Sequence, residues 1–341
     1  MWRSKTQGAF RYLFCKYKYL FLKNDTTSLL ISFITDYFAY TLNSDTFAFP
    51  YPKIMQTVKQ YFRKALSVRY DSEEVRAITN LVLEKKLDMP PYQLLMNERE
   101  ILPDNQRAEL CSIADRLSSG EPVQYILGEA EFCGATFRVT PDVLIPRPET
   151  AELVDWIVSE YNSAQSFRIM DIGTGSGCIA ISIARILPNS EVSAVDVSAA
   201  ALSVASSNAD INNVKVDFIL ADILNTDSQL PSSLDCIVSN PPYIMEKEKV
   251  EMEEHVLEHE PHLALFVSDS DPLLFYRTIA HRVTKLLKPG GSLFFEINSQ
   301  FGRETVDMLS SLGFRNIELR KDFFGKDRMV KASRITGMDL P

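Results

Sequence analysis

The chain has 341 residues and a mass of 38.6 kDa, which allows two domains with substantial cores. Hydrophobic residues make up 45% of it and charged residues 24%, as in a globular protein that folds in water. The formal net charge of −9 argues against a broad electrostatic grip on nucleic acid. The five cysteines are odd in number and lack C-x-x-C spacing, which favours reduced thiols over disulfides or a zinc site.

Residues 1–52 are predicted to be an extension ahead of the first domain. The first 24 residues carry six basic side chains and no acidic one, as transit peptides do, but serine is scarce and aromatic residues are dense. The apolar run 28–42 contains Asp36 and is too short to span a bilayer. We expect a cytoplasmic protein without membrane association; the alternative is a mitochondrial protein whose extension is a transit peptide.

Residues 53–128 are predicted to form a small helical domain. Val58 and Phe62 lie on one face of its first helix, Asp71 is placed to cap a second, and a further helix is predicted over 104–117. This segment contains no acid–base pair and no metal-ligand spacing, so its expected role is substrate docking.

Residues 129–148 are predicted to be a hairpin linker. Alternating apolar residues indicate two strands, with Pro141-Asp142 as the turn between them. A helix is predicted over 151–161, with Thr150 as its N-cap.

Residues 149–336 are predicted to form an α/β domain. From residue 167 strands alternate with helices, which is typical of a doubly wound sheet of parallel strands. The predicted strands are 167–172, 191–196, 214–220, 234–239, 291–297, 314–320 and 328–333. The predicted helices are 178–187, 198–209, 272–287 and 302–311. The short link through residues 324–327 favours an antiparallel hairpin at one edge of the sheet.

A glycine-rich loop follows the first predicted strand of this sheet. Glycines let the backbone come close to a ligand, and the next helix adds partial positive charge at its N-terminus. Asp171 would repel a pyrophosphate but suits an ammonium or sulfonium charge, which disfavours an NAD-dependent oxidoreductase. The candidate cofactor-binding residues of the loop are Asp171, Gly173, Thr174, Gly175, Ser176 and Gly177.

The next strands of the sheet also end in polar residues. Asp196 can accept both hydroxyls of a ribose, and Asp222 can accept from an adenine amino group while Ile223 packs on the base. Each of these acids can instead cap the following helix. Parallel strands end at one edge of a sheet, so these residues are candidates for the same cofactor site.

The fourth strand of the sheet is followed by Asn240-Pro241-Pro242-Tyr243, in which the prolines end regular structure. The Asn240 side-chain oxygen and nearby backbone carbonyls can accept hydrogen bonds from an NH2 group, and Tyr243 offers a flat face. An ordinary loop at the end of a strand is the alternative. Asn240 is also a candidate for cofactor binding.

These motifs resemble a known family. Three features are similar to S-adenosylmethionine-dependent N-methyltransferases: D-x-G-T-G-S-G, an acid that ends the second strand, and N-P-P-Y at the end of the fourth. Four further segments resemble the release factor glutamine methyltransferases, the PrmC/HemK family: G-E-P-V-Q-Y-I-L-G (120–128), I-P-R-P-E-T (145–150), E-P-H-L-A-L (260–265) and G-K-D-R-M-V (325–330). The resemblance covers residues 55–335 and departs at Asn298, where the family usually has glycine.

The resemblance implies a class I S-adenosylmethionine-dependent methyltransferase fold: a Rossmann-like, seven-stranded, mostly parallel sheet with a small N-terminal helical bundle. It implies methyl transfer from S-adenosylmethionine, leaving S-adenosylhomocysteine, to the amide N5 of the glutamine in the Gly-Gly-Gln motif of class I peptide chain release factors. Asn240, Pro241 and Tyr243 would be catalytic and, with Pro242, would bind the substrate glutamine. We expect a monomer without metal that pairs transiently with its protein substrate.

Other functions remain open on the sequence. An adenine N6-methyltransferase shares N-P-P-Y but needs a basic target-reading region, whereas residues 53–120 are mixed in charge. A ribosomal-protein glutamine is another possible substrate. A non-catalytic cofactor-binding scaffold is disfavoured because Asn240 to Tyr243 are intact.

The segment 246–260 is acidic and carries histidines. The spacing of His255, His259 and His262 could gather imidazoles around a metal, but Pro261 and the many glutamates favour a solvated acidic helix. The segment could also cover the substrate as a lid.

Overall fold

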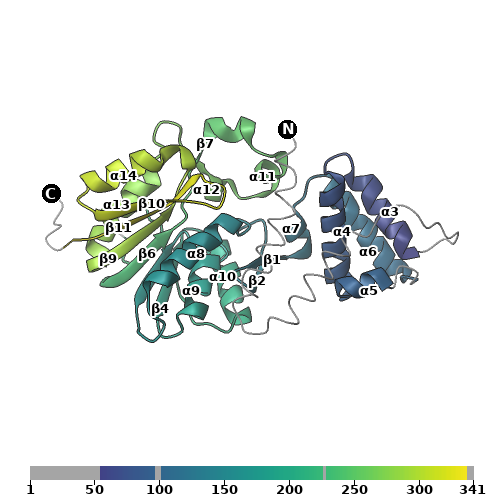
Figure 1. Ribbon diagram of the computed structural model, residues 1–341, viewed down its shortest axis with the longest axis horizontal. Coiled ribbons are helices and arrows are strands. Elements are labelled where there is room, and N and C mark those ends of the chain that lie inside the picture. Colours follow the sequence, from purple (N-terminus) through teal and green to yellow (C-terminus); the bar gives the residue numbers. More distant parts are fainter. Residues whose placement is uncertain (1–53, 97–100, 226–227, 336–341) are drawn as a thin grey trace. The chain divides into compact units, whose positions relative to one another are not determined.

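The structure is a computed structural model that describes residues 54–96, 101–225 and 228–335 (Figure 1). The predicted extension at 1–52 lies outside these ranges. The chain divides into two compact units between Leu127 and Gly128, and each is described by itself.

The first unit is a bundle of α-helices. Its helices are α3 (Ile54–Leu66), α4 (Ser72–Leu87), α5 (Pro91–Met96), α6 (Asp104–Ser118) and α7 (Val123–Leu127). Phe62, Leu83 and Leu117 come from three different helices and are completely buried in one core. Asp71 caps α4, because its carboxylate accepts from two backbone N–H groups of the first turn, at 2.9 and 3.0 Å. The predicted helices of this unit are therefore confirmed.

The second unit is built on a seven-stranded sheet in the order β10-β11-β9-β6-β3-β4-β5. Its strands are β3 (Arg168–Ile172), β4 (Glu191–Asp196), β5 (Asp217–Leu220), β6 (Leu234–Ser239), β9 (Leu287–Glu296), β10 (Arg315–Lys321) and β11 (Asp327–Ser333). Six of these strands run in one direction, and β11 runs opposite to them, between β10 and β9. The seven-stranded, mostly parallel sheet and its antiparallel edge hairpin are confirmed.

Two strands begin three or four residues away from their predicted starts, whereas the other strand boundaries agree to within one residue. β5 begins at Asp217 rather than at residue 214, and β9 begins at Leu287 rather than at residue 291. Leu287 already pairs with Leu234, and a register shift then absorbs the Pro-Gly-Gly residues before Ser292 pairs with Cys236. The glycines and proline of β9 thus form a bulge, although Pro-Gly is ordinarily a turn signal.

Helices cover both faces of the sheet (Figure 1). Successive residues of a strand point to opposite faces. Phe294 of β9 packs on Trp156 of α8 (Pro148–Glu160), with 5.3 Å between ring centroids. Phe295 packs on Tyr276 of α13 (Leu274–Leu286), at 5.2 Å. Three more helices complete the layers: α9 (Cys178–Ile186), α10 (Ala199–Ile211) and α14 (Gly302–Ser311).

The predicted turn of the linker hairpin is wrong. The hairpin consists of β1 (Glu129–Phe132) and β2 (Ala135–Arg138), and its two-residue turn is Cys133-Gly134, with φ of 47° and 68°. Tight hairpin turns favour positive φ, which glycine adopts freely and proline cannot. Pro141-Asp142 therefore lies beyond the hairpin.

The predicted N-cap of the next helix is also wrong. Helix α8 begins at Pro148 and Arg147 is its N-cap residue, because proline is favoured in the first turn, where its missing N–H costs no hydrogen bond. Thr150 lies inside the first turn, and its hydroxyl is used elsewhere.

Short elements connect β6 to α13. They are β7 (Ile244–Met245), the 3-10 helix η1 (Glu246–Glu251), α11 (Glu254–His259), α12 (His262–Leu265) and β8 (Phe266–Val267), and a second 3-10 helix, η2 (Ser299–Phe301), follows β9. β7 and β8 pair in parallel. Within the described ranges, no helix is both long and apolar enough to cross a bilayer.

Candidate active site

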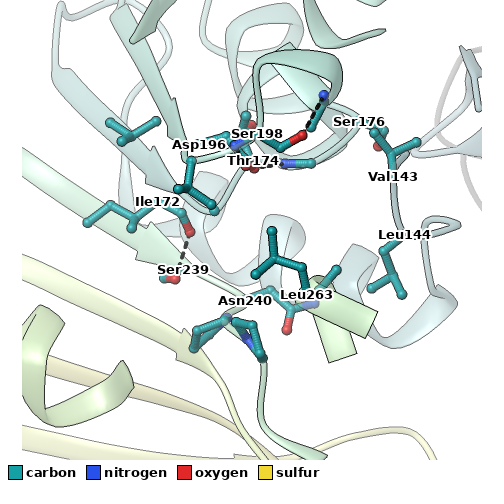
Figure 2. A pocket seen from close by; sticks show the side chains of 18 of the residues that line it. Val143, Leu144, Ile172, Thr174, Ser176, Asp196, Ser198, Ser239, Asn240 and Leu263 are labelled. Atoms are coloured by element: carbon teal, nitrogen blue, oxygen red, sulfur yellow. Dashed lines mark hydrogen bonds between the residues drawn. The ribbon is translucent and has the colours of Figure 1, made fainter. Parts of the chain in front are cut away.

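A cavity of about 300 Å³ lies at the carboxyl ends of β3, β4, β5 and β6 (Figure 2). This is where open α/β sheets bind ligands, and the volume is in the range of small-molecule sites. In Figure 2, Thr174, Asp196 and Ser198 lie on one side of the cavity and Asn240 lies on the other. The side formed by the ends of β3, β4 and β5 is called the cofactor wall below.

The glycine-rich loop is held on the sheet by its backbone. The N–H groups of Gly173 and Thr174 both donate to the carbonyl of Val195, at 2.8 and 3.1 Å. Gly173 and Gly175 have φ of 73° and 54°, and a Cβ at either position would meet no atom within 4 Å. Both glycines line the cavity, so their bare backbone leaves room for a ligand.

Asp171 lies behind this loop and does not line the cavity. One carboxylate oxygen accepts from the Thr174 hydroxyl at 2.6 Å, and the other makes no hydrogen bond of good geometry. Burial raises the pKa of Asp171 to about 7, with a further rise from the charge of Asp196; Thr174 and the backbone N–H of Ala180 oppose it. A cation bound nearby would favour the charged carboxylate.

Gly177 is also absent from the cavity wall. A Cβ there would come within 2.8 Å of the Ile181 side chain and 3.1 Å of Ala205, which belong to α9 and α10. Gly177 therefore permits close packing of these helices. Thr174 and Ser176 of the same loop do line the cavity.

Asp196 and Asp222 both line the cavity, as does Ile223. One Asp196 oxygen accepts from the Gly175 N–H at 2.8 Å and the other from the Ser198 N–H at 2.9 Å, which leaves further lone pairs for a ligand. Asp222 is exposed and accepts from the Leu224 N–H at 2.8 Å.

Asn240, Pro241 and Pro242 form part of the opposite wall. The strand before them is tied to β3, because the Ser239 hydroxyl donates to the Ile172 carbonyl at 2.7 Å (Figure 2). Tyr243 does not line the cavity; its hydroxyl donates to Glu296 at 3.1 Å, and burial raises its pKa. The structure thus brings the first three residues of N-P-P-Y to the cavity and directs the tyrosine hydroxyl away from it.

Two segments line the cavity that the sequence analysis did not assign to the site. Residues from Val143 to Arg147 and from Pro261 to Ala264 contribute to the cavity lining, and Leu263 lies beside Asn240 (Figure 2). They are joined by the carboxylate of Glu260, which is completely buried and accepts from Arg147 at 2.6 Å and from the Ile145 N–H at 3.4 Å. Together with Asn240, Pro241, Pro242 and Thr150, these segments form what is called the substrate wall below. The motifs I-P-R-P-E-T and E-P-H-L-A-L were visible in the sequence, but their proximity was not.

The three histidines of the acidic segment have separate environments. His262 contacts the Leu257 carbonyl at 2.9 Å, His255 lies 3.3 Å from Glu253, and the buried Nε2 of His259 has no partner. Pro261 interrupts the helix between His259 and His262, as predicted. No cluster of three or more metal-ligating side chains occurs in the described part of the chain.

The cofactor wall fits S-adenosylmethionine. The buried carboxylate of Asp171 can balance a cation, and the bare backbone at Gly173 and Gly175 leaves room for the amino-acid part of the cofactor. Asp196 retains acceptor capacity for ribose hydroxyls, and Asp222 and Ile223 provide an acceptor and an apolar surface for an adenine.

Comparison with known proteins gives matches to both units. The family model described as PrmC N-terminal domain matches residues 57–128, and the one described as Methyltransferase small domain matches residues 153–263. A T. thermophilus 16S rRNA N2 G1207 methyltransferase structure is similar at 18% identity and a TM-score of 0.44, over 60% of this chain and 49% of that one.

Two curated relatives are similar over most of their length. The release factor glutamine methyltransferase of Bacteroides thetaiotaomicron is 48% identical, over 82% of this chain and all of the relative. That of Flavobacterium psychrophilum is 44% identical, over 82% of this chain and 99% of the relative. The resemblance seen in the motifs is confirmed, and the chain belongs to the release factor glutamine methyltransferase family.

Proposed function

We propose that this protein methylates the side-chain amide N5 of the glutamine in the Gly-Gly-Gln motif of class I peptide chain release factors. The names of its relatives support this substrate. The observation that carries the proposal is the cavity itself, in which Asn240 and Pro241 stand opposite a wall suited to S-adenosylmethionine.

An amide nitrogen is a poor nucleophile because its lone pair is delocalised into the carbonyl. In the proposed mechanism the side-chain oxygen of Asn240 and the carbonyl of Pro241 accept hydrogen bonds from the two N–H groups of the substrate amide. Tyr243 was predicted to flank the glutamine, but it does not line the cavity, so its contribution would come through its hydrogen bond to Glu296 behind the wall. These contacts would hold the nitrogen in a fixed direction toward the methyl group and increase its electron density. Alignment of this kind can provide effective molarities of about 10⁵ M or more, so no strong base is required.

When bound, S-adenosylmethionine supplies an electrophilic methyl group on a sulfonium. Asp196 would hold its ribose, and Asp222 and Ile223 its adenine. The loop from Gly173 to Ser176 would hold the amino-acid part, with the charge of Asp171 behind it, whereas Gly177 would act through helix packing. Formation of the bond between the amide nitrogen and the methyl carbon would break the carbon–sulfur bond, which leaves neutral S-adenosylhomocysteine. The methylated nitrogen would then lose one N–H proton to solvent.

The helical unit would dock the protein substrate. In this proposal residues 53–128 bind the release factor, residues 129–148 link the domains, and residues 149–336 carry out the transfer. The partner is a class I release factor that a monomer engages transiently in the cytoplasm, without binding nucleic acid. Residues 1–52 remain an extension of the chain.

The test is methylation of a purified class I release factor with radiolabelled S-adenosylmethionine. We expect label in the wild-type release factor and none in a variant whose Gly-Gly-Gln glutamine is replaced by alanine. Equal labelling of both would overturn the proposed target. Ribosomal protein and RNA, offered in parallel, test the alternative substrates directly.

A further inference from the structure

A chain of hydrogen bonds runs behind the substrate wall. The Tyr243 hydroxyl donates to one oxygen of Glu296 at 3.1 Å, and the Thr150 hydroxyl donates to the other at 2.6 Å. The side-chain Nδ2 of Asn240 then donates to Thr150 Oγ1 through a long contact of 3.4 Å. Glu296 and Thr150 are almost completely buried, with exposures of 1% and 2%.

The direction of this chain is fixed by its buried end. An ionised carboxylate can only accept hydrogen bonds, so with Glu296 ionised both hydroxyl groups point their protons at it. Burial raises the pKa of Glu296, and the hydrogen bond from Thr150 and the charge of Arg328 oppose that rise. Thr150 has one proton and has used it, so only its lone pairs remain for Asn240. The group of Asn240 that faces Thr150 must therefore be the NH2, and the carbonyl oxygen is left for the cavity.

We propose that Glu296 and Thr150 are positioning residues that determine which end of the Asn240 carboxamide faces the substrate. This inference rests on the proposed function, in which Asn240 must accept a hydrogen bond from a substrate NH2. A carboxamide turned by 180° would have almost the same shape but would present its own NH2 to the substrate. Two donors would then face each other, and the substrate nitrogen would lose its alignment.

Glutamine in place of Glu296 provides the sharpest test, because it has nearly the same shape. The Tyr243 proton needs the single oxygen of the new amide, so the amide NH2 faces Thr150. Thr150 then accepts from that NH2 and donates its own proton to Asn240. The direction of the hydrogen bonds is reversed, so the Asn240 oxygen faces Thr150 and its NH2 faces the cavity. We expect Glu296→Gln to lower the single-turnover methylation rate about 100-fold with little change in affinity for S-adenosylhomocysteine.

Three further variants distinguish a reversed hydrogen-bond chain from a general loss of packing around Glu296. Adding Tyr243→Phe to Glu296→Gln frees the amide oxygen for the Thr150 proton, so the double variant should recover part of the lost rate. Thr150→Val removes the acceptor of the Asn240 NH2 group and should slow methylation. Thr150→Ser keeps the hydroxyl and should methylate faster than Thr150→Val, close to the wild-type rate. In an Asn240→Ala background, Thr150→Val should cause no further loss; an additive loss would mean that Thr150 acts through packing.

The orientation of the Asn240 carboxamide in this hydrogen-bond chain can also be tested by NMR, without measuring methylation. In protein labelled with ¹⁵N-asparagine, the side-chain NH2 signals of Asn240 are those missing from Asn240→Ala. They should move in Glu296→Gln and Thr150→Val but not in Thr150→Ser. If the Asn240 signals keep their positions in Glu296→Gln and Thr150→Val, the inference is overturned. It is also overturned if the signals move but these variants methylate at the wild-type rate. If the wild type fails to methylate release factors, the proposed function fails, and the spectra still decide whether the chain orients Asn240.

Discussion

The two walls of the cavity are built in different ways. The cofactor wall consists of strand ends and the turns that follow them, and its hydrogen bonds run mainly between backbone and side chains of neighbouring strands, such as Gly175 to Asp196. The substrate wall is assembled from segments far apart in the chain, through buried side chains such as Glu260 and Glu296. The first wall follows from the sheet itself, whereas the second depends on a few specific contacts.

The largest effect that separates the two walls is expected from Asn240→Ala. It removes a proposed substrate acceptor and should lower methylation about 100-fold to 1,000-fold, a loss typical of a key oriented hydrogen-bonding group. Affinity for S-adenosylmethionine, measured by calorimetry, should change little. A large loss of cofactor affinity would show that Asn240 serves the cofactor wall, and unchanged turnover would remove it from catalysis.

The difference between the walls also explains what the sequence could predict. Asp196 ends a strand, and the glycine-rich loop, Asp222 and Asn240 each follow one, so the strand pattern was enough to bring them to one edge of the sheet. The contacts of the second wall span 113 residues between Arg147 and Glu260, and 146 between Thr150 and Glu296. Neither periodicity nor spacing encodes such pairs, because they form only when the tertiary fold brings the segments together.

The sequence predictions were wrong where two local signals for a turn or a helix start competed. Pro141-Asp142 is a good turn signal, but the hairpin turns immediately after β1 ends at Phe132. Cys133 and Gly134 both adopt the positive φ that the tight turn needs. Pro148 and Thr150 both favour the start of a helix, and the proline decides it. Gly177 matched a ligand-binding pattern although its closest neighbours are helix side chains, a distinction that requires coordinates.

Stability should also distinguish the walls, and Arg147→Ala is the next largest expected effect. The substitution leaves the buried carboxylate of Glu260 without its cation. We expect a loss of about 2 kcal/mol in the free energy of unfolding, less than for a fully buried pair because the Arg147 side chain is 33% exposed. Urea denaturation measures the loss.

A matched control for Arg147→Ala is Arg107→Ala. Arg107 pairs with Asp104 at 2.6 Å on the surface of the helical unit, where both side chains are exposed. Its loss should cost about 0.5 kcal/mol or less. Equal effects of the two substitutions would show that the Arg147–Glu260 pair does not hold the substrate wall together.

On the cofactor wall, Asp196→Asn should have a smaller and different effect. An amide cannot accept from both the Gly175 and Ser198 N–H groups, because one of its ends is a donor. We expect affinity for S-adenosylmethionine to fall about tenfold, with the methylation rate at saturating cofactor nearly retained. Asp222→Asn, at an exposed position with one backbone contact, is the control and should do less. A fall in rate at saturation would contradict the separation of the two walls.

The smallest expected effect is the pH dependence of cofactor binding through Asp171. Its pKa of about 7 in the free protein means that the carboxyl is largely protonated at pH 6, and a bound cation should lower that pKa. Binding at pH 6 should therefore release up to one proton, and affinity should rise with pH, by at most about tenfold per pH unit, until it levels off above pH 7.

Folding of the free protein should show the opposite trend, because a raised pKa means that the native state holds the proton more tightly than the unfolded chain. The stabilisation from protonated Asp171 is complete below its usual pKa of 3.8 and is lost as the pH rises to about 7.

Calorimetric titrations of cofactor at pH 6, in two buffers of different ionisation enthalpy, count the protons released on cofactor binding. Asp171→Asn should abolish the difference between the buffers. If the wild type already shows none, the charge of Asp171 does not reach the bound cofactor, and the cofactor wall acts through its backbone and Asp196 alone.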